Sequence, residues 1–337
     1  MKEKVERVFG FLKKKDIPTF ISTNIYDILY LTEVQVSFGF LFVLPEKIIF
    51  STDGRYRGYA KNLKEIEFIE YKGKETIEKL IKENSIKSIY LDPKKEKISL
   101  LEFLKNFDLE IFHSEDFFED IRKIKTYEEI VRISQAVKIT KDVFREIEKD
   151  IFNLTEYEIR TQILKKYYEK GALGEGFETI VAADKNASIP HYHTSFSKPT
   201  YLCLIDTGCR YKNYVSDLTK TYIKKDAPYD IKKIYEIVKE AQEEAIKAIK
   251  PNMKVKELDS LVRNIFKKYG YEEFYLHSLG HGIGVYVHEK PRISVKSDEI
   301  LEENMIITIE PGLYIEGLGG VRLEEDILIT KYGGVKL

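Results

Sequence analysis

Hydrophobic and polar positions follow two patterns along the first third of the chain. Val5, Val8, Phe9 and Leu12 recur at helical spacing, which predicts an amphipathic helix at the amino terminus. Short apolar runs follow, and several of them are separated by helical stretches. They predict strands at 19–21, 38–44, 48–50, 66–71, 89–91 and 109–112. Because apolar strands that alternate with helices usually form a sheet covered by those helices, we expect an α/β domain here.

The pattern changes further along, and we place a domain boundary between residues 118 and 119, giving domains 1–118 and 119–337. Thr126 with Glu129, and Thr155 with Glu158, have the spacing of capping boxes, so each pair predicts the start of a long helix. Beyond residue 171 the chain becomes rich in strand patterns, interrupted by helices expected at 229–249 and 255–269. The predicted fold class is therefore α/β (α+β) with two domains.

Charge and hydropathy exclude some classes of function. The 337 residues contain 55 Lys and Arg against 56 Asp and Glu, a net charge of -1, so we expect neither nucleic acid nor an anionic membrane as a partner. No apolar run reaches about 18 residues, and the charged first helix does not resemble a signal peptide, which predicts a cytoplasmic protein. A charged fraction of 33%, with no Trp, is typical of a thermophile.

Cys203 and Cys209 are the only cysteines, and they lie on either side of Asp206. Two cysteines at this spacing match neither a secreted disulfide framework nor a zinc site. We therefore predict that both are small buried residues.

Carboxylates and imidazoles gather in three segments of the second domain, each combining an apolar run with glycines. The candidate metal ligands are Asp206, Asp217, His281, Glu310 and Glu324. A carboxylate at the end of an apolar run is unfavourable to bury alone, and a cation removes that penalty. Four carboxylates balance the formal charge of two divalent ions, and a bridging hydroxide leaves the site nearly neutral. The set therefore predicts a site for two divalent ions.

Single members of this set are weaker evidence than the whole. Asp206 stands in an Asp-x-Gly sequence, which is also common in solvated turns. A hairpin-like pair of strands would bring Asp206 and Asp217 together. The histidines are more specific, because five of the six occur in or near glycine-containing strand segments: His191, His193, His277, His281 and His288. Neutral imidazole is a common metal ligand and acid–base group.

The donor types narrow the choice of metal and chemistry. Oxygen ligands with one imidazole suit Mn²⁺ or Co²⁺, with Fe²⁺ and Zn²⁺ as alternatives. Two such ions about 3.5 to 4 Å apart lower the pKa of bound water and polarise a carbonyl. Hydrolysis is therefore the leading chemistry.

Several motifs resemble the pita-bread metallopeptidases of family M24, and among them the Xaa-Pro dipeptidases, or prolidases. The second domain contains GFETIVAADKNASIPHYH, DTGCRYKNYVSDLTKT, GHGIGVYVHEKPR, TIEPGLY and GGVRLEED in that order. NIYDILYLT and TDGRYRGYA resemble the creatinase-like amino-terminal domain of the same proteins. The resemblance implies a creatinase-like α/β domain followed by a pita-bread catalytic domain, and a homodimer.

The resemblance also implies roles for individual residues. Asp206 would hold one metal ion, His281 and Glu310 the other, and Asp217 and Glu324 would bridge the two. A bridging hydroxide would be the nucleophile and Glu310 the proton shuttle.

The substrate would meet residues outside the metal ligands. The resemblance implies that His288 stabilises the tetrahedral intermediate or the carbonyl oxygen and that His191 lines the substrate site. Arg292 would meet the free carboxylate of a small Xaa-Pro peptide, although a surface or interdomain salt bridge is its alternative. Lys220 stands where the family often has arginine, and we expect this change to tune the site.

Three other functions stay open at this point. An Xaa-Pro aminopeptidase would act on longer peptides, and a non-catalytic pita-bread protein would only bind in the pocket. The latter should have lost ligands, whereas all five remain. Creatinase-like hydrolysis is disfavoured because it does not need the complete metal set.

Overall fold

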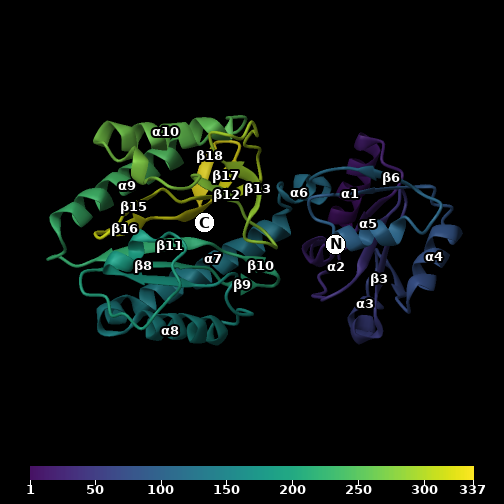
Figure 1. Ribbon diagram of the computed structural model, residues 1–337, viewed down its shortest axis with the longest axis horizontal. Helices are drawn as coiled ribbons and strands as arrows, with labels where there is room; N and C mark the ends of the chain where they lie inside the picture. The colour runs from purple at the N-terminus through teal and green to yellow at the C-terminus, as the bar shows by residue number, and fades with distance from the viewer. The chain divides into compact units, whose positions relative to one another are not determined.

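The computed structural model describes every residue from Met1 to Leu337 and divides into two compact units, Met1–Ile121 and Arg122–Leu337 (Figure 1). The boundary expected between residues 118 and 119 lies inside helix α6 (Phe117–Arg122), and it stays a prediction. None of the helices combines the length and the apolar character needed to cross a membrane.

The amino-terminal unit contains one six-stranded mixed sheet in the order β4-β3-β2-β1-β5-β6. The strands are β1 (Phe20–Ser22), β2 (Phe40–Val43), β3 (Ile48–Thr52), β4 (Glu67–Glu70), β5 (Ser88–Leu91) and β6 (Glu110–His113). Strand β2 pairs antiparallel with β1 and β3, whereas β1–β5, β3–β4 and β5–β6 are parallel. Each predicted strand is confirmed, with small shifts at its ends.

Helices accompany this sheet as the pattern predicted. They are α1 (Lys2–Lys15), α2 (Ile25–Thr32), α3 (Arg57–Ala60), α4 (Lys74–Glu83) and α5 (Ile98–Leu104). Apolar residues of α4 and α5 share one core with the sheet, including Ile77, Leu104 and Phe42. Strands β2 and β3 are buried at every position, as expected for central strands of a covered sheet.

The carboxy-terminal unit has four long helices: α7 (Tyr127–Ile147), α8 (Glu156–Glu169), α9 (Tyr229–Ala248) and α10 (Val255–Tyr269). Both predicted capping boxes are present. At α7, Glu129 N donates to Thr126 Oγ1 at 3.3 Å, and Thr126 N donates back to the Glu129 carboxylate at 2.9 Å. These reciprocal hydrogen bonds explain why the helices start where the sequence predicts.

Strands of the carboxy-terminal unit form two main sheets, β11-β8-β7 and β13-β12-β14-β17-β18, and two small pairs, β9–β10 and β15–β16. Their bounds are β7 (Ile180–Ala183), β8 (Leu202–Thr207), β9 (Arg210–Tyr211), β10 (Tyr214–Val215), β11 (Leu218–Ile223), β12 (Gly280–Gly282), β13 (Glu289–Ile293), β14 (Ile306–Ile309), β15 (Gly312–Ile315), β16 (Gly319–Arg322), β17 (Glu325–Thr330) and β18 (Gly333–Lys336). Figure 1 shows the strands between α9 and α10 on one side and α7 and α8 on the other. The strands therefore bring distant segments together in the middle of the unit.

Candidate metal centre

Strands β8 and β11 deliver the first two candidate ligands. Asp206 belongs to β8, and Asp217 immediately precedes β11. The two strands pair antiparallel with Asp206 opposite Thr219, so the expected hairpin-like arrangement is present, with the small β9–β10 hairpin inserted between its arms. This pairing places Asp206 and Asp217 on neighbouring strands of one sheet.

The second main sheet and the β15–β16 pair deliver the other three ligands. His281 lies in β12, Glu310 directly follows β14, and Glu324 lies between β16 and β17. Gly280 permits a close approach here, because a Cβ at this position would lie 2.8 Å from the Thr308 carbonyl carbon and from its Oγ1. A larger residue would push the strand that carries His281 away from the strand that carries Glu310.

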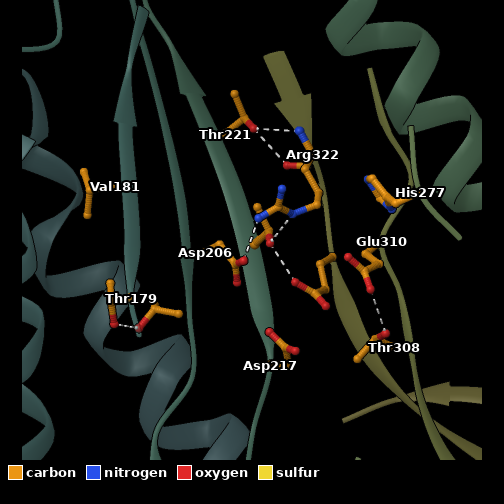
Figure 2. A network of polar contacts seen from close by, with 12 residues as sticks. Thr179, Val181, Asp206, Asp217, Thr221, His277, Thr308, Glu310 and Arg322 are labelled. Atoms are coloured by element: carbon orange, nitrogen blue, oxygen red, sulfur yellow. Dashed lines mark hydrogen bonds and ion pairs between the residues drawn. The ribbon is translucent and has the colours of Figure 1, made fainter. Parts of the chain in front are cut away.

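The ligand atoms converge on one small volume. His281 Nε2 lies 3.7 Å from Asp217 Oδ2 and 3.4 Å from Glu310 Oε1. Asp217, His281 and Glu324 each offer a ligand atom, and these atoms lie within 4.8 Å of one another. Figure 2 shows Asp206 on one sheet and Glu310 on the facing strands, with Asp217 between them lower in the view. The fold thus gathers residues from five separate strand segments.

The hydrogen bonds of His281 leave one ring nitrogen available to a ligand. His281 Nδ1 lies 3.0 Å from the Gly282 carbonyl oxygen, and because a carbonyl only accepts, Nδ1 carries the proton. Nε2 then presents its lone pair to the carboxylates. Burial lowers the pKa of His281 to about 3, which keeps the ring neutral. A neutral imidazole in this orientation is the form that binds a metal ion.

Negative charge is poorly compensated among the carboxylates. Burial, together with the neighbouring carboxylates, raises the pKa of Asp217 and of Glu324 well above their ordinary values. Burial also raises the pKa of Glu310 to about 8. Ionised carboxylates this close repel one another in a site of low dielectric constant. The cluster therefore favours either bound protons or bound cations.

Arg322 is a buried cation beside this cluster, and the sequence reasoning missed it. Arg322 Nη2 donates to Asp206 Oδ2 at 2.6 Å (Figure 2). Nη1 donates to Tyr314 Oη at 2.8 Å, and Nε donates to Thr219 Oγ1 at 3.0 Å. Thr219 Oγ1 in turn donates to Glu324 Oε2 at 2.6 Å. The sequence did offer one signal for Arg322: it stands two residues before Glu324 in GGVRLEED, and alternate residues of a strand share a face.

The donor set fits divalent metal ions. Asp206 Oδ1 is buried and has no hydrogen-bond partner, although Oδ2 of the same carboxylate is paired. The buried guanidinium of Arg322 interacts with Asp206, Glu310 and Glu324, so one positive charge is set against several carboxylates. Unpaired carboxylate oxygens next to a neutral imidazole match the ligands of Mn²⁺, Co²⁺, Fe²⁺ and Zn²⁺.

Three other sequence-predicted residues lie near this cluster. The rings of His288 and His281 have centroids 4.5 Å apart in an edge-on arrangement. Burial lowers the pKa of His288, with further effects from the charges of His191, Asp206 and Arg292, so these groups lie within electrostatic range. The side chains of His191, His288 and Arg292 are exposed, unlike those of the metal-ligand candidates. Exposure beside a buried cluster is what substrate-facing residues need.

Other histidines and cysteines have ordinary structural surroundings. His277 Nε2 accepts from Tyr314 Oη at 2.9 Å and Nδ1 donates to the Ser278 carbonyl at 2.8 Å, so both ring nitrogens are occupied. His193 is exposed. Cys203 and Cys209 are buried, unpaired thiols, which confirms their expected burial.

Lys220 faces away from the candidate ligands, and the expectation that it tunes the site stays a prediction. Lys220 Nζ lies over the Phe144 ring of α7, 5.3 Å from its centroid. Side chains alternate along β11, so Thr219 and Thr221 contact Glu324 and Arg322 while Lys220 points to the opposite face. Sequence spacing alone did not reveal which face of β11 carries the site.

Comparisons with known proteins agree with this geometry. The chain matches the model of metallopeptidase family M24 over residues 131–331 and that of the creatinase/prolidase N-terminal domain over residues 4–124. The chain therefore belongs to metallopeptidase family M24 and is a hydrolase. The predicted fold class and family resemblance are confirmed.

Individual relatives extend along the whole chain. The Xaa-Pro dipeptidase of Pyrococcus furiosus is 34% identical over 349 residues, which cover 100% of this chain and 98% of the relative. The solved structure of an Xaa-Pro dipeptidase from Bacillus anthracis has a TM-score of 0.94 at 31% identity and covers 99% of this chain and 96% of the other. An X-Pro aminopeptidase from Thermotoga maritima has a TM-score of 0.87 at 33% identity, with 95% of each chain covered.

Proposed function

We propose that this chain is a metal-dependent dipeptidase that hydrolyses the bond before proline in Xaa-Pro dipeptides. The observation that carries the proposal is the convergence of Asp217, Glu324 and Glu310 on the neutral imidazole of His281. Relatives named Xaa-Pro dipeptidase that match the chain over its full length support the choice of substrate. Proline lacks an N–H and restricts the backbone, so this bond needs a dedicated enzyme.

Two divalent ions would occupy the site, with Mn²⁺ or Co²⁺ favoured and Fe²⁺ or Zn²⁺ as alternatives. Asp206 would hold one ion, His281 and Glu310 the other, and Asp217 and Glu324 would bridge them. The unpartnered Asp206 Oδ1 and the Nε2 lone pair of His281 support this assignment. Bound ions would supply an activated water and polarise the peptide carbonyl.

The chain's own residues would handle the proton and the substrate. Glu310 would be the proton carrier, because its carboxylate lies 3.4 Å from His281 Nε2, beside the place where the activated water would form. His288, exposed beside His281, would donate to the oxygen of the reacting carbonyl. His191 would line the same space and help to orient the peptide.

Arg292 is the proposed determinant of substrate length. Its guanidinium is exposed on β13, close enough for its charge to act on His288. A guanidinium can hold a carboxylate through two parallel hydrogen bonds, which suits the free carboxylate of a dipeptide. In a longer peptide that carboxylate lies further from the scissile bond.

Cleavage of longer peptides is the second candidate function, and the similarity to an X-Pro aminopeptidase from Thermotoga maritima favours it. One assay separates the two. The protein is stripped of metal, reloaded with each of the four ions singly, and given an Xaa-Pro dipeptide, an Xaa-Pro tripeptide and creatine. Faster turnover of the dipeptide supports the first proposal, and faster turnover of the tripeptide supports the second.

Two variants sharpen the assay. Arg292→Ala should raise KM for the dipeptide and leave the tripeptide little changed. Arg145→Ala, at an exposed arginine of α7, is the matched control and should change neither. Equal loss on both substrates in the Arg292 variant would remove the argument for dipeptide specificity.

We also propose a homodimer and a cytoplasmic location, both from the resemblance and the charge pattern. Sedimentation of the purified chain and fractionation of cells that produce it would test these two points.

A further inference from the structure

Glu289 is a buried carboxylate next to His288, with no part in the metal site. It is 5% exposed, at the first position of β13. Oε1 accepts from Val285 N at 3.1 Å and from Tyr286 N at 3.2 Å. Both donors belong to the segment that leads to His288. Oε2 faces a different partner, Lys125.

The segment held by these hydrogen bonds is a short loop. Gly282 of β12 pairs with Glu289 of β13, and the register shifts just before Gly282, so residues 283–288 form the connection. The Glu289 carboxylate fills the space beside Gly284, where a Cβ would lie 2.8 Å from Oε1. The loop thus closes around the carboxylate, and His288 stands at its end.

Two buried cations fix the carboxylate from the other side. Lys125 Nζ lies 3.2 Å from Glu289 Oε2, and Arg122 Nε lies 3.4 Å from Oε1. The side chains of Lys125 and Glu289 are each 1% exposed, and that of Arg122 is 4% exposed. Lys125 N also donates to the Asn304 carbonyl at 2.9 Å, which anchors its own segment. Removing one partner from such a group would leave uncompensated buried charge.

We propose that Glu289 is a positioning residue for His288. It connects the loop of residues 283–288 to the anchored cations Lys125 and Arg122, and so keeps the His288 ring against His281. The inference rests on the proposed function, in which His288 contacts the substrate. Glu289 itself touches neither the substrate nor the metal ligands.

Hydrogen bonds from other residues also hold the loop of residues 283–288, but they reach different backbone groups from those that Glu289 binds. Val215 N donates to the Gly284 carbonyl at 2.9 Å, and Arg210 Nη1 donates to the Val285 carbonyl at 3.0 Å. These bonds fix the first half of the loop through its carbonyl groups. Glu289 takes the N–H groups of Val285 and Tyr286, next to the residues that lead into His288.

Glu289→Gln is the sharpest perturbation. A carboxylate has two acceptor oxygens, whereas an amide has one oxygen and two N–H donors. The glutamine can accept from the loop N–H groups or from Lys125, and its NH₂ group must face donors on the other side. We expect kcat/KM to fall about 10- to 100-fold through kcat, because a small misplacement of a catalytic group has effects of this size.

A double-mutant cycle distinguishes positioning from general stability. In a His288→Ala background, Glu289→Gln should lower kcat/KM by less than about 3-fold, because its effect acts through His288. The matched control is Glu302→Gln, because Glu302 also pairs with a lysine, Lys123, but is exposed. It should change kcat/KM in neither background. An equal loss from Glu289→Gln with and without His288, or no loss, would overturn the proposal.

Hydrogen–deuterium exchange tests the same proposal without activity. The amides of Val285 and Tyr286 should exchange at least about 10-fold faster in Glu289→Gln than in the unmodified chain, since a lost charged hydrogen bond changes exchange by this order. Unchanged exchange would refute the loop argument even if the chain hydrolysed no Xaa-Pro peptide. If Glu289→Gln does not fold, Lys125→Met removes the buried cation instead and should give the same exchange change and the same dependence on His288.

Discussion

Removing metal should make the stability of this protein fall as the pH rises. Burial raises the pKa of Glu310 from 4.5 to about 8 in the chain without ions. Between these two pH values the folded state keeps a proton that the unfolded state has released. Because the folded state then binds more protons, the free energy of unfolding decreases with increasing pH across this interval.

The size of the effect follows from the pKa shift. One pKa unit corresponds to about 1.4 kcal/mol, so a shift from 4.5 to about 8 gives about 5 kcal/mol. Solvent still reaches the Glu310 side chain, which is 17% exposed, and screening there reduces the figure to about 2 to 4 kcal/mol. For a domain of this size, that corresponds to a fall in Tm of about 5 to 15 °C between pH 5 and pH 8.

Calorimetry at pH 5 and pH 8, with chelator and with Mn²⁺, measures this directly. Bound cations replace the protons on the carboxylates, so the loaded protein should lose little or no stability over the same interval. Glu310→Gln should weaken the pH dependence of the chelated protein, whereas the matched change Glu302→Gln should not. A chelated protein with the same Tm at both pH values would refute the electrostatic reasoning.

Three further predictions concern buried contacts of the carboxy-terminal unit. Arg322→Met removes the hydrogen bonds to Asp206 and Thr219 and should lower kcat/KM of the metal-loaded protein about 10- to 100-fold, as steady-state kinetics will measure. Gly280→Ala forces a Cβ against Thr308 and should reduce the free energy of unfolding by about 3 kcal/mol or more, and an unchanged urea midpoint would contradict the close approach of β12 and β14. Glu156→Ala deprives the N–H groups of Ala183 and Ser195 of their acceptor and should cost about 2 to 5 kcal/mol in urea unfolding, whereas a loss below about 1 kcal/mol would show that water replaces the carboxylate.

Much of the fold could be predicted because local signals agree with it. The apolar runs of the amino-terminal unit correspond to strands β1 to β6, and Thr126 and Glu129 form the capping box that their spacing predicts. The candidate ligands could also be picked out one by one, since Asp206 and Glu310 directly follow apolar runs and His281 lies among glycines. In these cases the residues that decide the structure are close together in the sequence.

Contacts between distant segments could not be predicted in the same way. The partnership of Arg322 with Asp206 joins residues 116 positions apart, and that of Lys125 with Glu289 joins residues 164 positions apart. Strand pairing decides such contacts, and a change in register by one residue turns a side chain to the opposite face. Lys220 illustrates the same limit, because its orientation follows from the pairing of β11 with β8.

The most direct test of the central claim is a metal titration of activity. The chelated protein should hydrolyse no Xaa-Pro dipeptide, and turnover should increase with added Mn²⁺ or Co²⁺ until two ions are bound per chain, as measured by metal analysis of the same samples. Turnover that persists unchanged in chelator, or metal-saturated protein that cleaves no dipeptide, would contradict the assignment of this site to Xaa-Pro hydrolysis.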